Sequence, residues 1–223
     1  MDKLIEALQA HLLDAVRLIF EPVAAFSDIL RREKRLADSL FVCAILGISG
    51  LSLFAGALGG ESALTPAFAF VLAPIFLFIF IAKLSWRVAR TPVSLEQATC
   101  FALVAAAVLA FSSGAFAAIG MAAMRLWQKS LYDWIYKNSM ANFLSLALVD
   151  PDKLEPFKDG KGFKIFTATS VAALAASLTY WVALFRAMAR TLVASNRQFL
   201  VATIVSVVAF SVINALLNLI VAF

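Results

Sequence analysis

The chain has 223 residues, of which 63% are apolar and 15% are charged, and its formal net charge is +5. Soluble domains carry about 25% charged residues, so this composition excludes an ordinary soluble domain and indicates an integral membrane protein. The 19 Lys and Arg residues stand in short clusters beside apolar segments, whereas a nucleic-acid-binding protein concentrates them on one face. We therefore expect no nucleic-acid partner.

Residues 1–38 are predicted to form a cytoplasmic, amphipathic segment. Its first 15 residues include Asp2, Glu6 and Asp14 and show no cleavage site of a secretory signal, so we expect them to be retained. From residue 4 to residue 30 apolar side chains recur every three or four positions, which is the spacing of one helical face. Pro22 lacks an amide hydrogen and is predicted to begin a second helix.

Two amphipathic helices of this kind are typical of a membrane surface, with basic side chains beside anionic lipid. The candidate basic residues are Arg31, Arg32, Lys34 and Arg35. Alternatively, the apolar face packs against the ends of the membrane spans or against another subunit. The sequence leaves both interpretations open.

Five apolar segments are long enough to cross about 30 Å of hydrocarbon as helices. They cover residues 40–59, 64–84, 98–124, 165–187 and 199–222. We therefore predict an all-α membrane protein in which residues 39–223 form a five-span helical bundle. Basic residues cluster before the first span, after the second and between the fourth and fifth, which predicts a cytoplasmic N-terminus and an outer C-terminus.

The segment 125–164 between the third and fourth spans is predicted to be an extracytoplasmic loop. It carries seven basic residues, which argues mildly against this orientation. In its first half Trp127, Leu131, Trp134 and Ile135 share one helical face, as in an interfacial helix with aromatic rings at headgroup level. Its second half is rich in Pro, Gly and Asp and is predicted to be a hairpin-like loop.

Small residues recur at a spacing of four in three of the predicted spans. Such residues let two helix backbones approach closely in lipid. The third span has Ala102, Ala106, Ala110, Gly114, Ala118 and Ala122; the first has Ser52, Gly56 and Gly60; the fourth has Ala168, Ala172 and Ala176. These positions predict helix-packing surfaces, either within the chain or between subunits.

Two further features of the spans could serve packing or transport. Asn214 and Asn218 lie one turn apart, so their amides should form hydrogen bonds with another helix, and a substrate-binding role is the alternative. Pro74 is predicted to kink the second span, and broken helices line the sites of some transporters.

Chemistry-bearing motifs are absent from the sequence. The central parts of the spans contain no Asp, Glu or His, and the sequence contains no phosphate-binding loop, metal-ligand spacing or nucleophile motif. Cys43 and Cys100 are expected to be small buried apolar residues. We therefore expect no enzyme activity, no cofactor and no metal site.

Three segments resemble the Yip domain family of Ypt/Rab-interacting membrane proteins and their bacterial relatives. They are LIFEPVAAF at residues 18–26, SWRVARTPVSLEQATCFAL at 85–103 and TYWVALFRAMARTLVASNRQFLVAT at 179–203. The loop at 125–164 is longer than is usual among the bacterial members. The resemblance implies a five-span protein of the bacterial inner membrane; it favours a non-enzymatic scaffold or accessory subunit and supplies no catalytic residues.

The resulting hypothesis is a non-enzymatic scaffold or accessory subunit that assembles with itself or with partner membrane proteins through small-residue helix faces. Its expected partners are membrane lipids, including anionic lipid, and a second copy or another membrane protein. The alternative is a permease-like or channel subunit of a transport complex.

Overall fold

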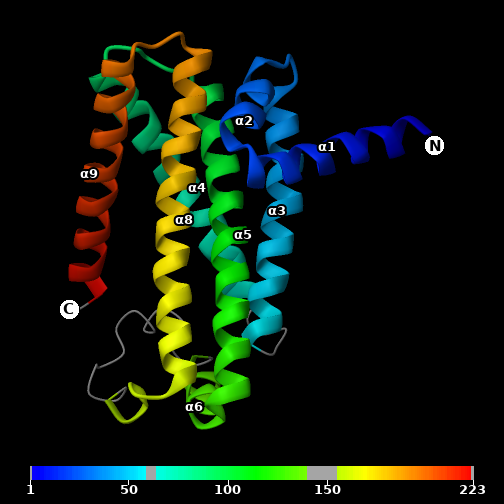
Figure 1. Ribbon diagram of the computed structural model, residues 1–223. Helices are drawn as coiled ribbons and strands as arrows, with labels where there is room; N and C mark the ends of the chain where they lie inside the picture. Colours follow the sequence, from blue (N-terminus) through cyan, green and yellow to red (C-terminus); the bar gives the residue numbers. More distant parts are fainter. Residues whose placement is uncertain (1, 59–63, 140–154, 222–223) are drawn as a thin grey trace. The chain divides into compact units, whose positions relative to one another are not determined.

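A computed structural model describes residues 2–58, 64–139 and 155–221. The side chains of residues 2–4, 7, 54, 55, 57, 58, 64–73, 135–139 and 214–221 lie outside the description. Within the described ranges the chain forms helices and no strand (Figure 1). Four helical stretches there are long and apolar enough to cross a membrane: Arg35–Leu53, Leu95–Trp127, Lys161–Thr191 and Asn196–Ile213. The prediction of an all-α membrane protein is confirmed.

The N-terminal segment forms α1 (Asp2–Phe20) and α2 (Pro22–Arg31). Pro22 stands in the first turn of α2, and Glu21 before it departs from helical dihedrals, with φ −132° and ψ 56°. This is the break predicted from Pro22, because the residue before a proline disfavours helical dihedrals. In Figure 1, α1 extends away from α2 as an arm that ends at the N-terminus.

The long helices begin or end several residues beyond the predicted spans. They are α3 (Arg35–Leu58), α4 (Leu64–Val88), α5 (Leu95–Trp127), α8 (Lys161–Thr191) and α9 (Asn196–Val221). Residues 35–38, predicted to belong to the surface segment, are therefore the first turn of α3. The predicted second span falls on α4, whose side chains are described from Pro74 onward.

The segment between α5 and α8 contains α6 (Lys129–Ser139) and a short 3-10 helix, η3 (Glu155–Phe157). The helix predicted in the first half of this segment is therefore present as α6, whereas Trp127 is the last residue of α5. Gly162, predicted to lie in the turn-rich half of the loop, is already in the first turn of α8.

The chain divides into two compact units. Unit 1 contains residues 1–45, 72–108 and 179–223, and unit 2 contains residues 46–71 and 109–178. Aromatic rings fill the core of unit 1: Phe101 of α5 lies 5.0 Å from Phe185 and 5.1 Å from Trp181, both on α8. Trp181 in turn meets Phe78 of α4 edge-on at 5.0 Å. These contacts hold α4, α5 and α8 together because stacked and edge-to-face aromatic pairs add about 0.5–1.5 kcal/mol each to the burial of their area.

Two turns of unit 1, between α4 and α5 and between α8 and α9, share one construction. Two positions after the last residue of each first helix stands a non-glycine residue with positive φ, Arg90 at 59° and Val193 at 53°. The next amide closes the helix end: Thr91 N donates to Trp86 O and Ala194 N donates to Ala189 O, both at 2.9 Å. This is the Schellman closure, which usually contains Gly.

The second helix of each pair begins with a Ser-x-x-Gln capping box. Ser94 exchanges hydrogen bonds with Gln97 at 3.0 and 3.1 Å, and Ser195 exchanges them with Gln198 at 2.8 and 3.3 Å. The sequences ARTPVSLEQ (89–97) and ARTLVASNRQ (189–198) therefore form two similar connections between helices.

Candidate membrane-interface and helix-packing sites

One side of α1 packs on the rest of unit 1. Leu18 and Ala15 are 0% and 2% exposed. The Tyr180 hydroxyl of α8 donates a hydrogen bond to the Ile19 carbonyl at 2.8 Å, and the His11 ring stacks on Phe41 of α3 at 4.7 Å. The C-terminal half of α1 is therefore held by both apolar and polar contacts.

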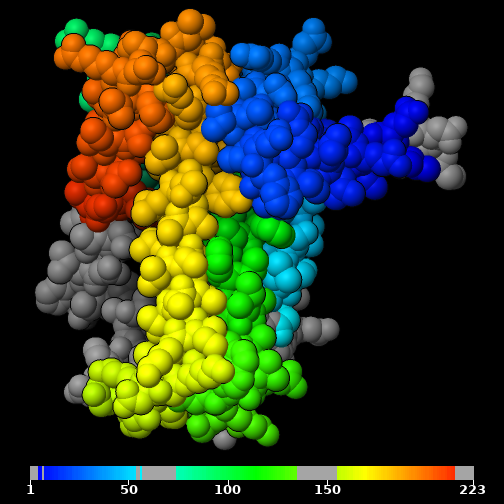
Figure 2. Space-filling model, in the orientation of Figure 1, coloured from blue at the N-terminus to red at the C-terminus, as the bar shows by residue number. Residues whose placement is uncertain are grey.

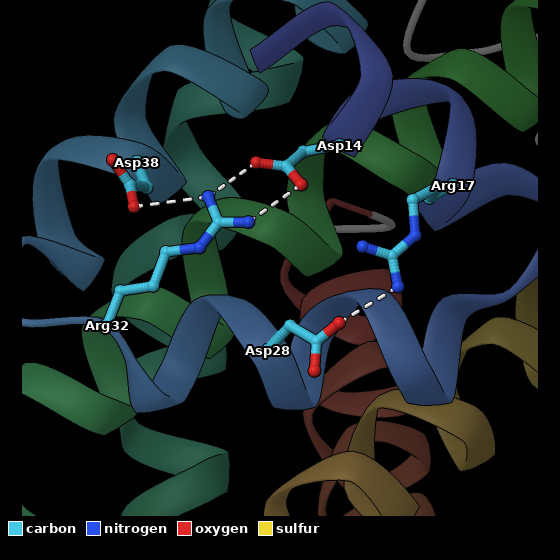
Figure 3. Close-up of polar contacts among 5 residues, drawn as sticks. All are labelled: Asp14, Arg17, Asp28, Arg32 and Asp38. Atoms are coloured by element: carbon cyan, nitrogen blue, oxygen red, sulfur yellow. Dashed lines mark hydrogen bonds and ion pairs between the residues drawn. The ribbon is translucent and has the colours of Figure 1, made fainter. Parts of the chain in front are cut away.

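Ion pairs join α1 to α2 and α3, as Figure 3 shows. Arg32, which follows α2, donates to both carboxylate oxygens of Asp14 at 2.5 and 2.9 Å and to Asp38 at 3.3 Å. A second pair joins Arg17 of α1 to Asp28 of α2 at 2.9 Å. The hydrogen bonds to Asp14 are the main cause that raises the pKa of Arg32 above its ordinary value. Arg32 is thus a permanent cation that fastens three elements.

The apolar side of α2 is covered by its own chain. Phe26, Ile29 and Leu30 are each at most 1% exposed, and the Ser27 hydroxyl lies 3.4 Å from the Ala187 carbonyl of α8. Of the two interpretations of the N-terminal segment, packing within the chain is therefore right for α2.

The other side of α1 carries apolar residues that remain exposed. Their exposed fractions lie between 44% and 79%, and the residues are Ile5, Leu8, Leu12, Leu13, Val16 and Phe20. At 100° per residue they cover an arc of about 140° on the helix. We call this surface the α1 outer face. Figure 2 shows α1 standing out from α2.

The four basic residues predicted to meet anionic lipid fall into two groups. Arg32 is bound to Asp14 and Asp38, and Arg35 donates to Glu96 of α5 at 2.8 Å. Arg31 and Lys34 are exposed. Of the four, Arg31 and Lys34 are therefore the cations that can meet a lipid headgroup. The sequence pattern could not show this difference, because it does not reveal which cations have carboxylate partners within the chain.

In unit 2, α3 and α5 approach backbone to backbone. A Cβ added to Gly50 would lie 2.6 Å from the Ala110 carbonyl carbon and oxygen and from the Phe111 nitrogen. A Cβ on Gly114 would overlap the Gly50 carbonyl oxygen. Gly114 was predicted as a packing residue and packs within the chain. Its partner Gly50 was missed because it stands outside the Ser52-Gly56-Gly60 series.

The small-residue series of α5 does not stay on one helical face. A spacing of four exceeds the helical repeat by about 40° per step, or about 200° over five steps. Ala102 and Ala106 are accordingly buried in unit 1, Gly114 is buried against α3, and Ala122 is exposed. The series predicted as packing positions therefore divides among several neighbours and does not form one surface.

Beyond the Gly50–Gly114 contact, four small residues of α3 and α5 line an open cleft of about 340 Å³. We call it the α3–α5 cleft. Its walls carry four residues predicted as packing positions, namely Ser52, Gly56, Ala118 and Ala122, and the other described residues of its lining are Leu53, Met121, Arg125 and Tyr132. A Cβ added to Gly56 would meet no atom within 4 Å, so this stretch of the two helices leaves space between them.

The predicted interfacial aromatic residues lie in different surroundings. Trp127, at the end of α5, is 52% exposed, and the Lys161 ammonium lies 4.9 Å from its ring centre. Trp134 of α6 is partly buried against a cluster of Met121, Met124 and Leu131, with the Phe157 ring 6.2 Å away. Part of the apolar face of α6 is thus used inside unit 2.

Gln128, at the break between α5 and α6, organises this end of unit 2. Its side-chain nitrogen donates to the Phe157 carbonyl at 3.0 Å, and its side-chain oxygen accepts from the Phe163 amide at 2.9 Å. A Cβ on Gly160 or Gly162 would overlap the Gln128 side chain. The only sequence signal for this contact was the pair of glycines at 160 and 162.

The structure says less about the remaining residues that the sequence predicted as sites. Pro74 lies inside α4 and is half-buried. Gly60 and the side chains of Asn214 and Asn218 lie outside the described residues. Cys43 and Cys100 are free thiols, half-buried and buried. In the described part of the chain, no group of three or more His, Cys, Asp or Glu could hold a metal ion.

Comparison of the chain with protein-family models gives no match. Comparison with curated proteins and with solved structures likewise gives no match. The fold and the surfaces described above are therefore the basis for any assignment of function.

Proposed function

We propose that this chain is a non-enzymatic scaffold or accessory subunit of the bacterial inner membrane. The observation that supports this proposal is that the two sides of α1 lie in different surroundings. One side is fixed to the chain by Leu18 and by the Asp14–Arg32 ion pair, and the α1 outer face is left uncovered. A helix held rigidly at the end of membrane-spanning helices, with an apolar side exposed, suits the boundary between headgroups and acyl chains.

The proposed topology has five spans, with α4 as the fifth membrane helix beside the four named above. The side chains of α4 that are described include the apolar, buried Phe78, Ile81 and Ala82. The N-terminus is proposed to be cytoplasmic and the C-terminus outside. The exposed cations Arg31, Lys34, Arg87, Arg90, Arg190 and Arg197 support this orientation, since they all stand near span ends of unit 1.

The proposed assembly surface is the small-residue side of α8. Gly114 already packs within the chain, whereas Ala168 of α8 is exposed and Ala172 is half-buried. The neighbouring Val171 and Leu174 are 62% and 63% exposed. Small residues next to larger apolar ones form the kind of surface that brings a second membrane helix into close contact. The resemblance to the Yip domain family supports the same kind of role.

The α1 arrangement can be tested with spin labels in liposomes that contain phosphatidylglycerol. In a Cys43→Ala/Cys100→Ala background, one label replaces Leu12 on the α1 outer face and a matched label replaces Ala10, which is exposed on the side of Glu6 and Arg17. We expect the label at 12 to collide mainly with oxygen, and the label at 10 mainly with a water-soluble nickel complex. Equal exposure of both labels to the nickel complex would contradict the proposal.

The scaffold role can be tested by mass determination of the particle purified in mild detergent. We expect a self-assembled or hetero-assembled particle that Ala168→Leu dissociates, with Ala44→Leu on an exposed part of α3 as the control. A lone monomer without companions would contradict it. A conducting or transporting activity in proteoliposomes would instead favour the permease or channel alternative.

A further inference from the structure

The α3–α5 cleft has the dimensions of a small-molecule site. Its volume of about 340 Å³ lies at the lower end of the range of roughly 300–1,000 Å³ for ligand pockets. A cleft at the lower end of this range suits a narrow ligand such as an acyl chain, whereas a helix with its side chains, about 10–12 Å across, is a bulkier occupant.

Among the described residues the lining of the cleft is mostly apolar, with the hydroxyl groups of Ser52 and Tyr132 and one cation. Leu53, Gly56, Ala118, Met121 and Ala122 supply carbon surface. Arg125 also lines the cleft and stands two residues before the end of the membrane-spanning stretch Leu95–Trp127. Arginine at a span end extends its guanidinium to the headgroup level while its stem stays on apolar surface. Apolar walls below a single cation complement an acyl chain joined to a phosphate.

Arg125 is also available for a ligand. No Asp or Glu among the described residues forms an ion pair with it, whereas Arg17, Arg32 and Arg35 all have carboxylate partners. Its guanidinium presents several N–H donors in a plane, the geometry that binds a phosphate through two hydrogen bonds.

A second copy of the chain is a poorer occupant. Two copies that met symmetrically through this cleft would place the same surface on both sides, and so would bring one Arg125 toward the other. Like charges facing each other disfavour an interface.

We propose that the α3–α5 cleft binds one anionic phospholipid, with an acyl chain between α3 and α5 and the headgroup phosphate on Arg125. This inference goes beyond the scaffold role, because it gives the chain a specific lipid ligand at a site separate from α1.

The test is native mass spectrometry of the delipidated protein titrated with phosphatidylglycerol, and separately with phosphatidylcholine. Gly56→Leu fills the open space of the cleft, and Arg125→Gln removes its cation. Their matched controls are Ala44→Leu, at an exposed position of the same helix, and Lys129→Gln, which removes an exposed cation outside the cleft lining. Far-UV circular dichroism and thermal unfolding verify that each variant is folded.

For the wild-type chain we expect one retained phosphatidylglycerol molecule that is bound in preference to phosphatidylcholine. Arg125→Gln should weaken its binding about fivefold, the factor expected for the loss of one cation near an anionic headgroup. Gly56→Leu should abolish it, and both controls should bind as the wild type does. Equal retention in Gly56→Leu and the wild type would overturn the proposal. So would a dimer that Gly56→Leu dissociates, because the cleft would then hold a second copy. Neither result would affect the spin-label test of α1.

Discussion

Replacing Gly50 or Gly114 with alanine tests whether α3 and α5 are held by direct backbone contact. An alanine Cβ at position 50 would lie 2.6 Å from three backbone atoms of α5, whereas real Cβ contacts essentially never fall below 3.0 Å. Backbone atoms cannot rotate away as a flexible side chain can. The two helices must therefore separate, and we expect the overpacking cost of about 1–3 kcal/mol.

Gly56 provides the matched control on α3. A Cβ there meets nothing within 4 Å, so Gly56→Ala retains only the gain in helix propensity of about 1 kcal/mol. The two substitutions are chemically identical and should have opposite signs: Gly50→Ala destabilises and Gly56→Ala stabilises. The free energy of unfolding can be measured in mixed micelles by titration with sodium dodecyl sulfate, with far-UV circular dichroism as the signal.

A double substitution makes the test sharper. If Gly50→Ala has already moved the helices apart, Gly114→Ala should add less than its own cost, because both glycines serve one contact. Equal free energies of unfolding for Gly50→Ala and Gly56→Ala would refute the reasoning. Strict additivity of Gly50→Ala and Gly114→Ala would show that the two positions act separately.

Three further substitutions test other contacts by thermal unfolding in detergent. Asp14→Asn removes the charge and one of the two acceptor oxygens that face Arg32, leaves Asp38 at 3.3 Å as its carboxylate partner, and should destabilise the protein by about 1–3 kcal/mol; an unchanged melting temperature would contradict the role of the ion pair. Gln128→Ala removes two hydrogen bonds, so it should cost about 1–3 kcal/mol and increase amide exchange at Phe163; amide exchange that stays as slow as in the wild type would count against it. Val193→Gly relieves a β-branched residue at φ 53°, where a Cβ costs about 1–2 kcal/mol. This gain exceeds the cost of about 0.5–1 kcal/mol for the added freedom of glycine in the unfolded chain, so the melting temperature should rise. Val182→Gly, at an exposed interior position of α8, is the control and should lower it.

Local features of the sequence predicted much of the secondary structure correctly. Long uninterrupted apolar segments predicted membrane-spanning helices because the hydrocarbon layer requires every backbone group to bond within its own segment. Pro22 marked the junction of α1 and α2, since a missing amide hydrogen and a restricted preceding residue act over one or two positions. The capping boxes at Ser94 and Ser195 are equally local and could have been read from the Ser-x-x-Gln spacing.

Which surfaces meet was decided only by the tertiary structure. The sequence does not distinguish the four cations Arg31, Arg32, Lys34 and Arg35 from one another. In the structure, however, Arg32 and Arg35 are bound to carboxylates on other helices. Gly114 packs on Gly50, while Ala118 and Ala122 on the same helix line an open cleft. The amino-acid sequence thus determined where the helices run and that they suit a membrane. Which neighbour each helix face meets depends on the rotation of the helix about its axis and on residues distant in the chain. A periodic pattern within one segment holds no information about either.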